Sequence, residues 1–496
     1  MHRVATVDPD RVAIVGDGAH LTYAELAQDA RGIAAFIDGC VRALPVSTDL
    51  PVVGICVRSA FVTARLVVGL EAGSTILTVV DPQWPQALQI QMIRNTRTQI
   101  LLTDVPGLPD ALRAAGWGGT IIPASDLDHL ASAGSTPGEG ASMMDSAKDD
   151  DAPFLMLFSS GTTGTPKAFL KTRAQYLANV AVSREFLGAH PGVATFAPGP
   201  LSYSLTLYAL FEGLATGGRV HVADRLDELW LTGRAREENV TRLVTVPSAL
   251  HALADAAHRS PARFEGLRLI ITGGAALSSA TRARGTNEMP QARLVSYYGA
   301  GELGFIGDSR DGDGTRIQLY PRVEALVRDD AGHALEPGEL GTLWVRSGSC
   351  TTQYLPHTTD AELSDAEGWA TVHDQGSLDG RMFVFAGRRG EVVATGGHKV
   401  ALAEVERAFD GMPGVGVVCA IALPHPSLGS VVGLVLEGDD LPSKRVLREW
   451  AASQLPSASV PRRWHAVPSL PRTGGGKVRR GATVQLVLSG TGATRL

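Results

Sequence analysis

Residues 158–171 read FSSGTTGTPKAFLK, and the rest of the chain is organised around this stretch. The apolar run Phe154–Phe158 predicts a buried strand, which leads into serines, threonines and glycines before the loop closes with Pro166 and Lys167. Glycines let the backbone approach an anion closely, while hydroxyls, N–H groups and a lysine offer it hydrogen bonds and charge. The stretch therefore predicts a strand followed by a loop that binds a polyphosphate.

This loop has two other interpretations. A Walker A motif needs four residues between its first glycine and the Gly-Lys-Ser/Thr group. Here two residues separate Gly161 from Gly164, and Lys167 follows a proline, so the loop is not a Walker A motif. A surface turn with a solvated lysine fits short segments of this composition, but the strand, the donors and the lysine together favour a phosphate loop.

Length and composition indicate a soluble globular protein. Its 496 residues exceed one ordinary core, so we expect about two or three domains. The 45 basic and 51 acidic side chains leave a net charge of −6, which gives no reason to propose a nucleic-acid partner. The four cysteines lack metal-ligand spacing and are expected to be reduced thiols: Cys40, Cys56, Cys350 and Cys419.

Neither secretion nor a membrane span is expected. The N-terminal residues MHRVATVDPDRVAIV carry charges where a signal peptide needs its apolar stretch. No segment reaches the roughly 18 uninterrupted apolar residues of a spanning helix. We therefore predict a cytoplasmic protein.

The pattern of strands and helices predicts the fold class. Short apolar strands alternate with helices, one of which begins at Thr22 with the capping-box spacing to Glu25. After the phosphate loop, further strands are expected at 219–222, 243–246, 267–272 and 294–297. Such alternation predicts an α/β fold with helix-covered, mostly parallel sheets whose ligands bind where strands end. Two of these strand ends carry Gly273-Gly274-Ala275 and Tyr297-Tyr298-Gly299.

The C-terminal third of the chain has a different pattern of predicted strands and helices. Short strands with turns such as Glu336-Pro337-Gly338 predict a small β-barrel-like subdomain over about 315–387. Beyond Gly387-Arg388, about a hundred residues have their own α+β pattern and predict a mobile lid domain. We therefore expect an N-terminal domain over residues 1–387 and a lid over 388–496. Near its end, the lid displays Lys477 on a glycine-rich loop that a solvated tail would also explain.

Seven motifs in order resemble those of the adenylate-forming superfamily, which includes acyl-CoA synthetases, carrier-loading adenylation domains and beetle luciferases. The resemblance runs from about residue 11 to 481. Its motifs in this chain are the 158–171 loop, Gly273-Gly274-Ala275, Tyr298-Gly299-Ala300-Gly301-Glu302, His373-Asp374, Gly387-Arg388, Gly396-Gly397-His398-Lys399-Val400 with Glu404-Val405-Glu406, and Lys477.

The resemblance implies a role for each motif. Lys477 would bridge the carboxylate and the α-phosphate, and Glu302 would bind Mg²⁺. ATP would be held by Ser159, Ser160, Gly161, Thr162, Thr163, Gly164, Lys167, Gly273, Gly274, Ala275, Tyr298, Gly299, Asp374 and Arg388. After lid rotation, the CoA or thiol channel would be formed by Gly396, Gly397, His398 and Lys399.

The resemblance also implies the overall reaction. ATP would activate a carboxylic acid as an acyl-adenylate, and CoA would then take the acyl group as a thioester. The acid pocket is expected to be lined by Tyr203, Val246, Gly299 and Phe305, with Leu207 and Ala275 nearby. This apolar lining shows no obvious acidic residue for an amino group, and favours an aliphatic or aromatic acid.

Three positions depart from the family pattern. Gly301 replaces the threonine of Tyr-Gly-x-Thr-Glu, Gly390 replaces a charged hinge residue, and Tyr203 stands where many relatives have histidine. Two alternatives therefore stay open at this point. The acceptor could be the phosphopantetheine of a carrier protein, or the chain could be a specialised member that performs one half-reaction.

Overall fold

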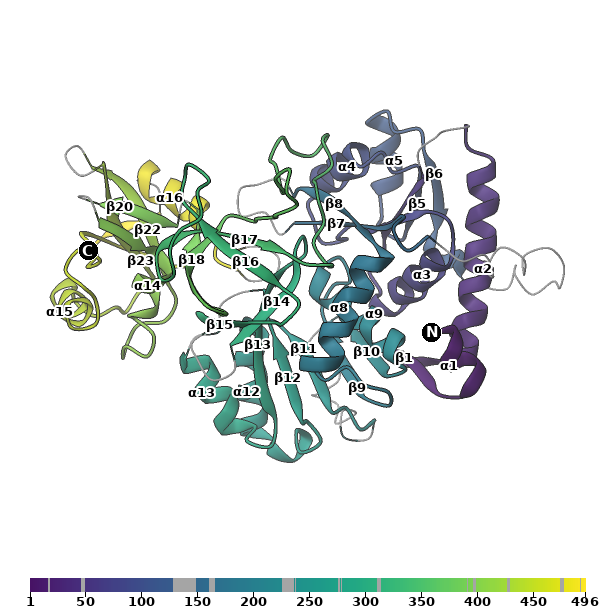
Figure 1. Cartoon of the computed structure of the whole chain (residues 1–496), viewed down its shortest axis with the longest axis horizontal. Helices are drawn as coiled ribbons and strands as arrows, with labels where there is room; N and C mark the ends of the chain where they lie inside the picture. Colours follow the sequence, from purple (N-terminus) through teal and green to yellow (C-terminus); the bar gives the residue numbers. More distant parts are fainter. Residues whose placement is uncertain are drawn as a thin grey trace.

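The structure, a computed structural model, describes most of the chain. Its described residues are 1–16, 18–45, 50–127, 149–159, 166–224, 236, 238–274, 277, 279–309, 314–389, 391–395, 398–425, 429–472, 477–490 and 492–496. Figure 1 shows the first sheet with α2–α5 at one end of the molecule, a larger sheet in the middle and the C-terminal domain at the other end.

The first sheet contains β7, the strand that was predicted before the phosphate loop, next to its edge strand β8. Neighbouring strands are parallel except for β7 and β8, which are antiparallel and flank the loop. Its spatial order is β6 (Thr120–Pro123), β5 (Ile100–Thr103), β3 (Val52–Cys56), β4 (Ile76–Val79), β7 (Pro153–Phe158) and β8 (Ala168–Thr172).

The helices of this part are amphipathic or fully apolar. α2 (Tyr23–Arg42) begins at the predicted capping box, in which the Thr22 hydroxyl and the Glu25 carboxylate each accept a backbone N–H. The other helical segments are α1 (His2–Val7), α3 (Ala60–Ala72), α4 (Gln86–Asn95), α5 (Leu108–Ala114) and the short 3₁₀ turn η1 (Ala124–Asp126).

The second sheet has a parallel middle and antiparallel flanks. From β1 to β13 the strands pair in parallel, and from β13 to β16 they pair antiparallel. Its order is β16 (Glu324–Arg328), β17 (Leu340–Arg346), β18 (Asp374–Asp379), β19 (Met382–Arg388), β15 (Arg316–Leu319), β14 (Gly304–Ser309), β13 (Arg293–Ala300), β12 (Leu269–Thr272), β11 (Arg242–Thr245), β9 (Ala194–Pro198), β10 (Arg219–Ala223), β1 (Val12–Gly16) and β2 (Ala19–Thr22).

The range predicted as a small β subdomain, about 315–387, contains β15 to β19, which pair antiparallel as part of this same sheet, and its status as a subdomain stays a prediction. The helical segments of the region are α8 (Arg173–Phe186), α9 (Ser204–Thr216), α12 (Pro247–Arg259), the 3₁₀ turn η3 (Pro261–Arg263) and α13 (Ser279–Glu288). One continuous hydrophobic core joins both sheets, from Ala13 to Phe383. The strands that flank the phosphate loop and the strands of the second sheet therefore belong to one packed body.

The C-terminal domain has hydrophobic clusters of its own, formed by residues between Val393 and Leu496. Its elements are β20 (Val392–Thr395), β21 (His398–Ala401), α14 (Leu402–Arg407), β22 (Val418–His425), β23 (Gly429–Glu437), α15 (Lys444–Gln454), β24 (Arg463–Val467), α16 (Arg480–Ser489) and β25 (Thr494–Arg495). The predicted α/β fold with a separate α+β C-terminal domain is confirmed, and the boundary at residue 387 stays a prediction. Among the described cysteines no disulfide forms.

Close packing of α2 on α3 gives a stability test. An added Cβ at Gly69 would lie 2.6 Å from the Ile33 Cβ, so Gly69→Ala is expected to lower the free energy of unfolding by about 1–3 kcal/mol. In the matched control Gly39→Ala, the nearest atom is Arg42 Nη2 at 3.8 Å, and the better helix propensity of alanine is expected to add up to about 1 kcal/mol. Urea denaturation followed by circular dichroism measures both, and equal stability of the two variants would contradict this packing.

Candidate active site

The base of the phosphate loop is closed by two hydrogen bonds. Ser159 donates its N–H to the Lys167 carbonyl at 2.8 Å, and Lys167 donates its N–H to the Ser159 hydroxyl at 3.0 Å. The other predicted loop residues, Ser160 to Gly164, lie outside the described residues. The described part thus fixes where the loop leaves β7 and returns to β8.

Tyr354 connects this loop to Glu302. The Lys167 ammonium lies over the Tyr354 ring, 5.0 Å from its centroid, and the Tyr354 hydroxyl donates to Glu302 Oε1 at 3.0 Å. Both Tyr354 and Glu302 are at most 9% exposed. Burial, and then the neighbouring Glu302 carboxylate, raise the pKa of the Tyr354 hydroxyl, so it remains a hydrogen-bond donor at neutral pH.

A second cluster joins three predicted residues at the ends of β13, β18 and β19. Tyr298 donates its hydroxyl to Asp374 Oδ2 at 2.6 Å, and Arg388 Nε donates to Asp374 Oδ1 at 3.2 Å. Burial raises the pKa of Asp374, and the Arg388 guanidinium opposes that rise. The Tyr298 ring lies against Phe383 and Phe385, which gives the cluster one apolar side.

Lys477 of the C-terminal domain lies close to this cluster. A Cβ added to Gly274, which follows β12, would lie 3.7 Å from Lys477 Nζ. Burial, and then the Arg388 guanidinium, lower the pKa of Lys477 to about 8. The structure therefore brings Lys477, Gly274 and Arg388 together across the two domains. Gly273 lies directly beneath the buried Tyr297 ring, and Ala275 lies outside the described residues.

The structure describes all four residues that were predicted to line the acid pocket. Tyr203 precedes α9 and Val246 precedes α12, while Gly299 and Phe305 face each other in the β13–β14 ladder. The Phe305 ring packs edge-on against the rings of Tyr208 and Tyr297, with both centroids at 4.8 Å. The pocket wall is therefore aromatic as well as apolar. Leu207 is fully buried in α9.

A carboxylate near Tyr203 was not among the residues predicted from the sequence. Asp81, which follows β4, is 2% exposed and accepts a hydrogen bond from the Gln83 N–H at 2.8 Å. Burial, and then the nearby Asp81 carboxylate, raise the pKa of the Tyr203 hydroxyl to about 12. The strand end at Asp81-Pro82 was its one sequence signal, because polar side chains that follow buried strands collect at sheet edges.

The predicted thiol channel is only partly visible. Gly396 and Gly397 lie outside the described residues, as does Gly390. His398 and Lys399 lie in β21, whose backbone pairs with β20 on the lid. The structure thus places these two positions on a lid hairpin and does not bring them into the group around Asp374.

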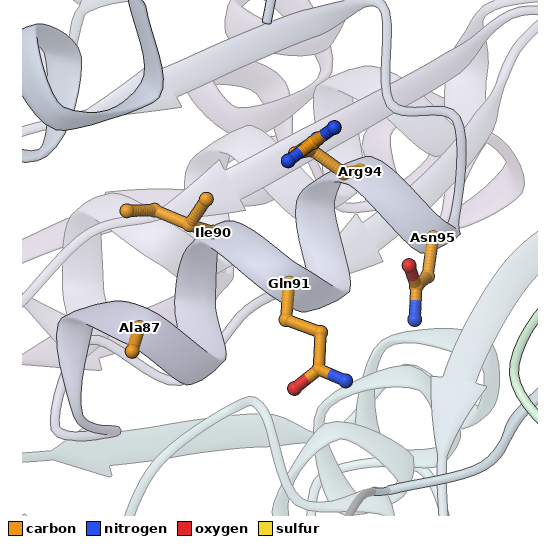
Figure 2. A pocket seen from close by; sticks show the side chains of 5 residues that line it. All are labelled: Ala87, Ile90, Gln91, Arg94 and Asn95. Atoms are coloured by element: carbon orange, nitrogen blue, oxygen red, sulfur yellow. The ribbon is translucent and has the colours of Figure 1, made fainter. Parts of the chain in front are cut away.

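Figure 2 shows the side chains of α4 that line a pocket. The pocket is lined by Ala87, Ile90, Gln91, Arg94 and Asn95. None of these is a predicted site residue, and only Arg94 is ionisable. The chemistry of the chain is concentrated at the strand ends instead.

Comparisons with known proteins agree with this geometry. Residues 1–355 match the family described as AMP-binding enzyme, and residues 404–477 match the AMP-binding enzyme C-terminal domain. The chain belongs to the AMP-binding enzyme family. It is therefore a member of the adenylate-forming superfamily, as its motifs predicted.

Two curated relatives and one solved structure illustrate the similarity. An uncharacterized acyl-CoA ligase, YhfT of Bacillus subtilis (strain 168), is 28% identical over 342 residues, covering 67% of this chain and 68% of the relative. The 2-succinylbenzoate–CoA ligase of Bacillus licheniformis is 25% identical over 497 residues, covering 96% and 97%. The fold also matches O-succinylbenzoate coenzyme A synthetase from Bacillus subtilis, in complex with ATP and magnesium ion, with a TM-score of 0.82, 20% identity and 98% of each chain covered.

The site fits the magnesium ion expected in an AMP-binding enzyme. The Tyr354 hydroxyl donates to one oxygen of the Glu302 carboxylate, and no protein donor to the other oxygen is found among the described residues. No group of three or more His, Cys, Asp or Glu side chains that could hold a metal is found in the described part of the chain. One carboxylate with substrate phosphates and water is the usual donor set for Mg²⁺, so the residues fit. No helix within the described residues is long and apolar enough to cross a membrane.

The departure at Gly301 from the AMP-binding motif has a steric reason. A Cβ at this position would lie 2.9 Å from Phe169 Cζ and 3.5 Å from Ser204 Oγ. Phe169, which is fully buried in β8, therefore occupies space that a threonine side chain would need. His373 adopts a left-handed φ of 62°, a conformation that favours glycine, and nothing in the structure explains the histidine there.

The contact between Phe169 and Gly301 predicts a compensating pair. Gly301→Thr alone is expected to destabilise the protein by about 1–3 kcal/mol through overlap with the ring. Phe169→Val in the same chain is expected to restore much of that loss because it removes the overlapping atoms. A double-mutant cycle on the apparent Tm and on pyrophosphate exchange measures the coupling. Additive effects of the two changes would show that the residues do not share this space.

Proposed function

We propose that this protein is an ATP-dependent acyl- or aryl-CoA ligase. It would activate a carboxylic acid as an acyl-adenylate with release of pyrophosphate, and then transfer the acyl group to the thiol of CoA. The observation that carries the proposal is the position of Lys477, which the lid holds beside Gly274 and Arg388. The motifs, the family and the CoA ligases among its relatives support it.

The first step requires positive charge at the reacting phosphate. When the carboxylate oxygen attacks the α-phosphorus, a bond to phosphorus forms while the bond to pyrophosphate breaks, and negative charge crowds the site. Lys167 and the loop residues Ser159 to Gly164 would hold the β- and γ-phosphates. Lys477 would position the carboxylate against the α-phosphate by contacting both groups. Glu302 would hold Mg²⁺, which supplies further charge neutralisation.

The nucleoside part of ATP would lie against the Tyr298–Asp374–Arg388 cluster. Tyr298 offers an aromatic face for the adenine, and Asp374 offers carboxylate oxygens to the ribose hydroxyls. The hydrogen bonds that Asp374 receives from Tyr298 and Arg388 fix its orientation before the nucleotide arrives. Such preorganisation lowers the entropic cost of positioning the substrate.

Thioester formation would follow a rotation of the lid. Withdrawal of Lys477 would open the side from which the thiol arrives, and the hairpin that carries His398 and Lys399 would move toward the acyl-adenylate. The aromatic and apolar walls at Phe305, Tyr208 and Tyr297 favour an aliphatic or aromatic acid. Pyrophosphate release screened over carboxylates, with and without CoA, tests the function. Transfer to a holo-carrier protein without any CoA turnover would favour the carrier-loading alternative.

Lys477→Ala separates the two half-reactions. We expect adenylate formation, measured by pyrophosphate exchange, to fall by about 100-fold or more. The variant loses the Lys477 ammonium, whose positive charge would stabilise the transition state. Thioester formation from synthetic acyl-adenylate and CoA is expected to persist. Arg479→Ala is the control, since Arg479 is an exposed neighbour on the same segment. Normal exchange in Lys477→Ala would remove this role from the lysine.

The pH dependence of adenylation follows from the same group. The pKa of Lys477 is lowered to about 8, so the ammonium loses its proton and its charge as the pH rises through that value. We expect kcat/KM for ATP, which reports the free enzyme, to fall above about pH 8. Lys477→Arg would be slower but would lack this alkaline limb, because a guanidinium stays charged. An unchanged limb in that variant would assign the titration to another group.

A further inference from the structure

Lys171 is a buried cation that the proposed chemistry does not use. It lies in β8, four residues after Lys167, and its side chain is 1% exposed. Its ammonium donates to the Glu302 carbonyl at 2.8 Å and to the Ser349 carbonyl at 2.6 Å. It also lies 5.9 Å from the centroid of the Phe169 ring. Lys171 is therefore hydrogen-bonded to the main chain of Glu302, whose carboxylate is the candidate metal ligand.

Burying this charge is costly for the fold. Within the described residues Lys171 has no carboxylate at ion-pair distance, and its partners are main-chain carbonyls. A buried ammonium costs several kcal/mol in lost hydration, and an apolar side chain of similar volume is often more stable. Packing alone would thus favour methionine or leucine here. The cation is better explained by what its hydrogen bonds hold in place.

Glu302 is held at both its main chain and its side chain. Lys171 and the Thr351 N–H donate to its carbonyl, the latter at 2.8 Å, and the Tyr354 hydroxyl donates to its carboxylate. The segment that contains Ser349 and Thr351 is itself held by hydrogen bonds. Ser349 donates its hydroxyl to the Leu303 carbonyl, and Thr351 donates its hydroxyl to the Leu170 carbonyl. Lys171 bridges this segment and the Glu302 turn from the strand that follows the phosphate loop.

We propose that Lys171 is a positioning residue that, together with Tyr354, fixes the Glu302 carboxylate in the orientation in which it receives the Mg²⁺ of ATP. This inference rests on the proposed function, since it requires the Glu302 site to bind Mg²⁺ with the nucleotide. Groups that orient a metal ligand change metal affinity by about 10–100-fold when they are removed. Lys171 acts through Glu302 and does not itself contact the metal or the phosphates.

Lys171→Met tests the proposal by a binding measurement. The substitution keeps much of the side-chain volume and removes both hydrogen bonds. We expect the Mg²⁺ concentration that gives half-maximal binding of α,β-methylene-ATP, measured by calorimetry, to rise about 10-fold or more. Pyrophosphate exchange should show the same shift in its Mg²⁺ dependence. Lys171→Arg, which retains a charged donor, should recover part of the affinity, and an unchanged Mg²⁺ dependence in Lys171→Met would overturn the proposal.

Gln175→Met is the matched control. Gln175 donates to the Cys350 carbonyl at 2.8 Å, within the same segment, and caps α8 through Thr172, but it has no hydrogen bond to Glu302. Its loss should lower stability without moving the Mg²⁺ dependence. An equal shift in this variant would mean that Lys171 acts only by holding the segment together. If Lys171→Met does not fold, Lys171→Arg and Tyr354→Phe carry the test, and wild-type Mg²⁺ dependence in both would overturn it.

Glu302→Gln distinguishes this inference from the proposed function. If that variant needs more Mg²⁺ than the wild type for half-maximal nucleotide binding while Lys171→Met does not, the role of Lys171 fails and the function stands. If Glu302→Gln retains wild-type binding and exchange, the assignment of Glu302 fails, and the role of Lys171 fails with it. If no carboxylate supports exchange but the Mg²⁺-dependent nucleotide binding shifts as expected, the positioning role survives and the ligase function does not.

Discussion

The approach of Lys477 to the Gly273–Gly274 turn is the contact on which the site depends. It joins a lid with its own hydrophobic clusters to the strand ends of a body with a separate core. Because the clusters of the two domains are separate, each domain can keep its own packing when their relative position changes. Under the proposed function, Lys477 would therefore approach the nucleotide and withdraw from it without the unfolding of either domain.

Much of the fold could be predicted because its signals are local. The strand before the phosphate loop, the capping box at Thr22 and the helix at Pro247 each follow from a few neighbouring residues. The strand order could not be predicted in this way. β1 pairs with β10 about two hundred residues later, and β15 pairs with β19 across the whole β16–β18 insertion. Those pairings depend on the packing of distant segments, which no local pattern records.

The same difference between local signals and distant partners applies to the residues of the candidate site. Glu302, Asp374, Arg388 and Lys477 were found because each sits in a motif with a fixed sequence environment. Tyr354, Lys171 and Asp81 were missed because their partners are distant in sequence, such as the Glu302 carbonyl that Lys171 reaches across 131 residues. The surroundings of Gly301 and the backbone conformation of His373 could also be seen only in the structure. A Cβ at Gly301 would overlap the Phe169 ring, and His373 has a left-handed backbone conformation.

The hinge shows how the lid could be held and still be released. Glu391 accepts the N–H of Arg388, which ends β19 of the body, and its other oxygen lies 3.3 Å from Nε of Arg480 in the lid. Arg480 also pairs with Glu406 inside the lid. The side chains of Glu391 and Arg480 are 25% and 20% exposed, so water can replace their contacts at modest cost. A partly solvated carboxylate that bonds to both domains can favour one position of the C-terminal domain and still allow the rotation that the proposed function requires.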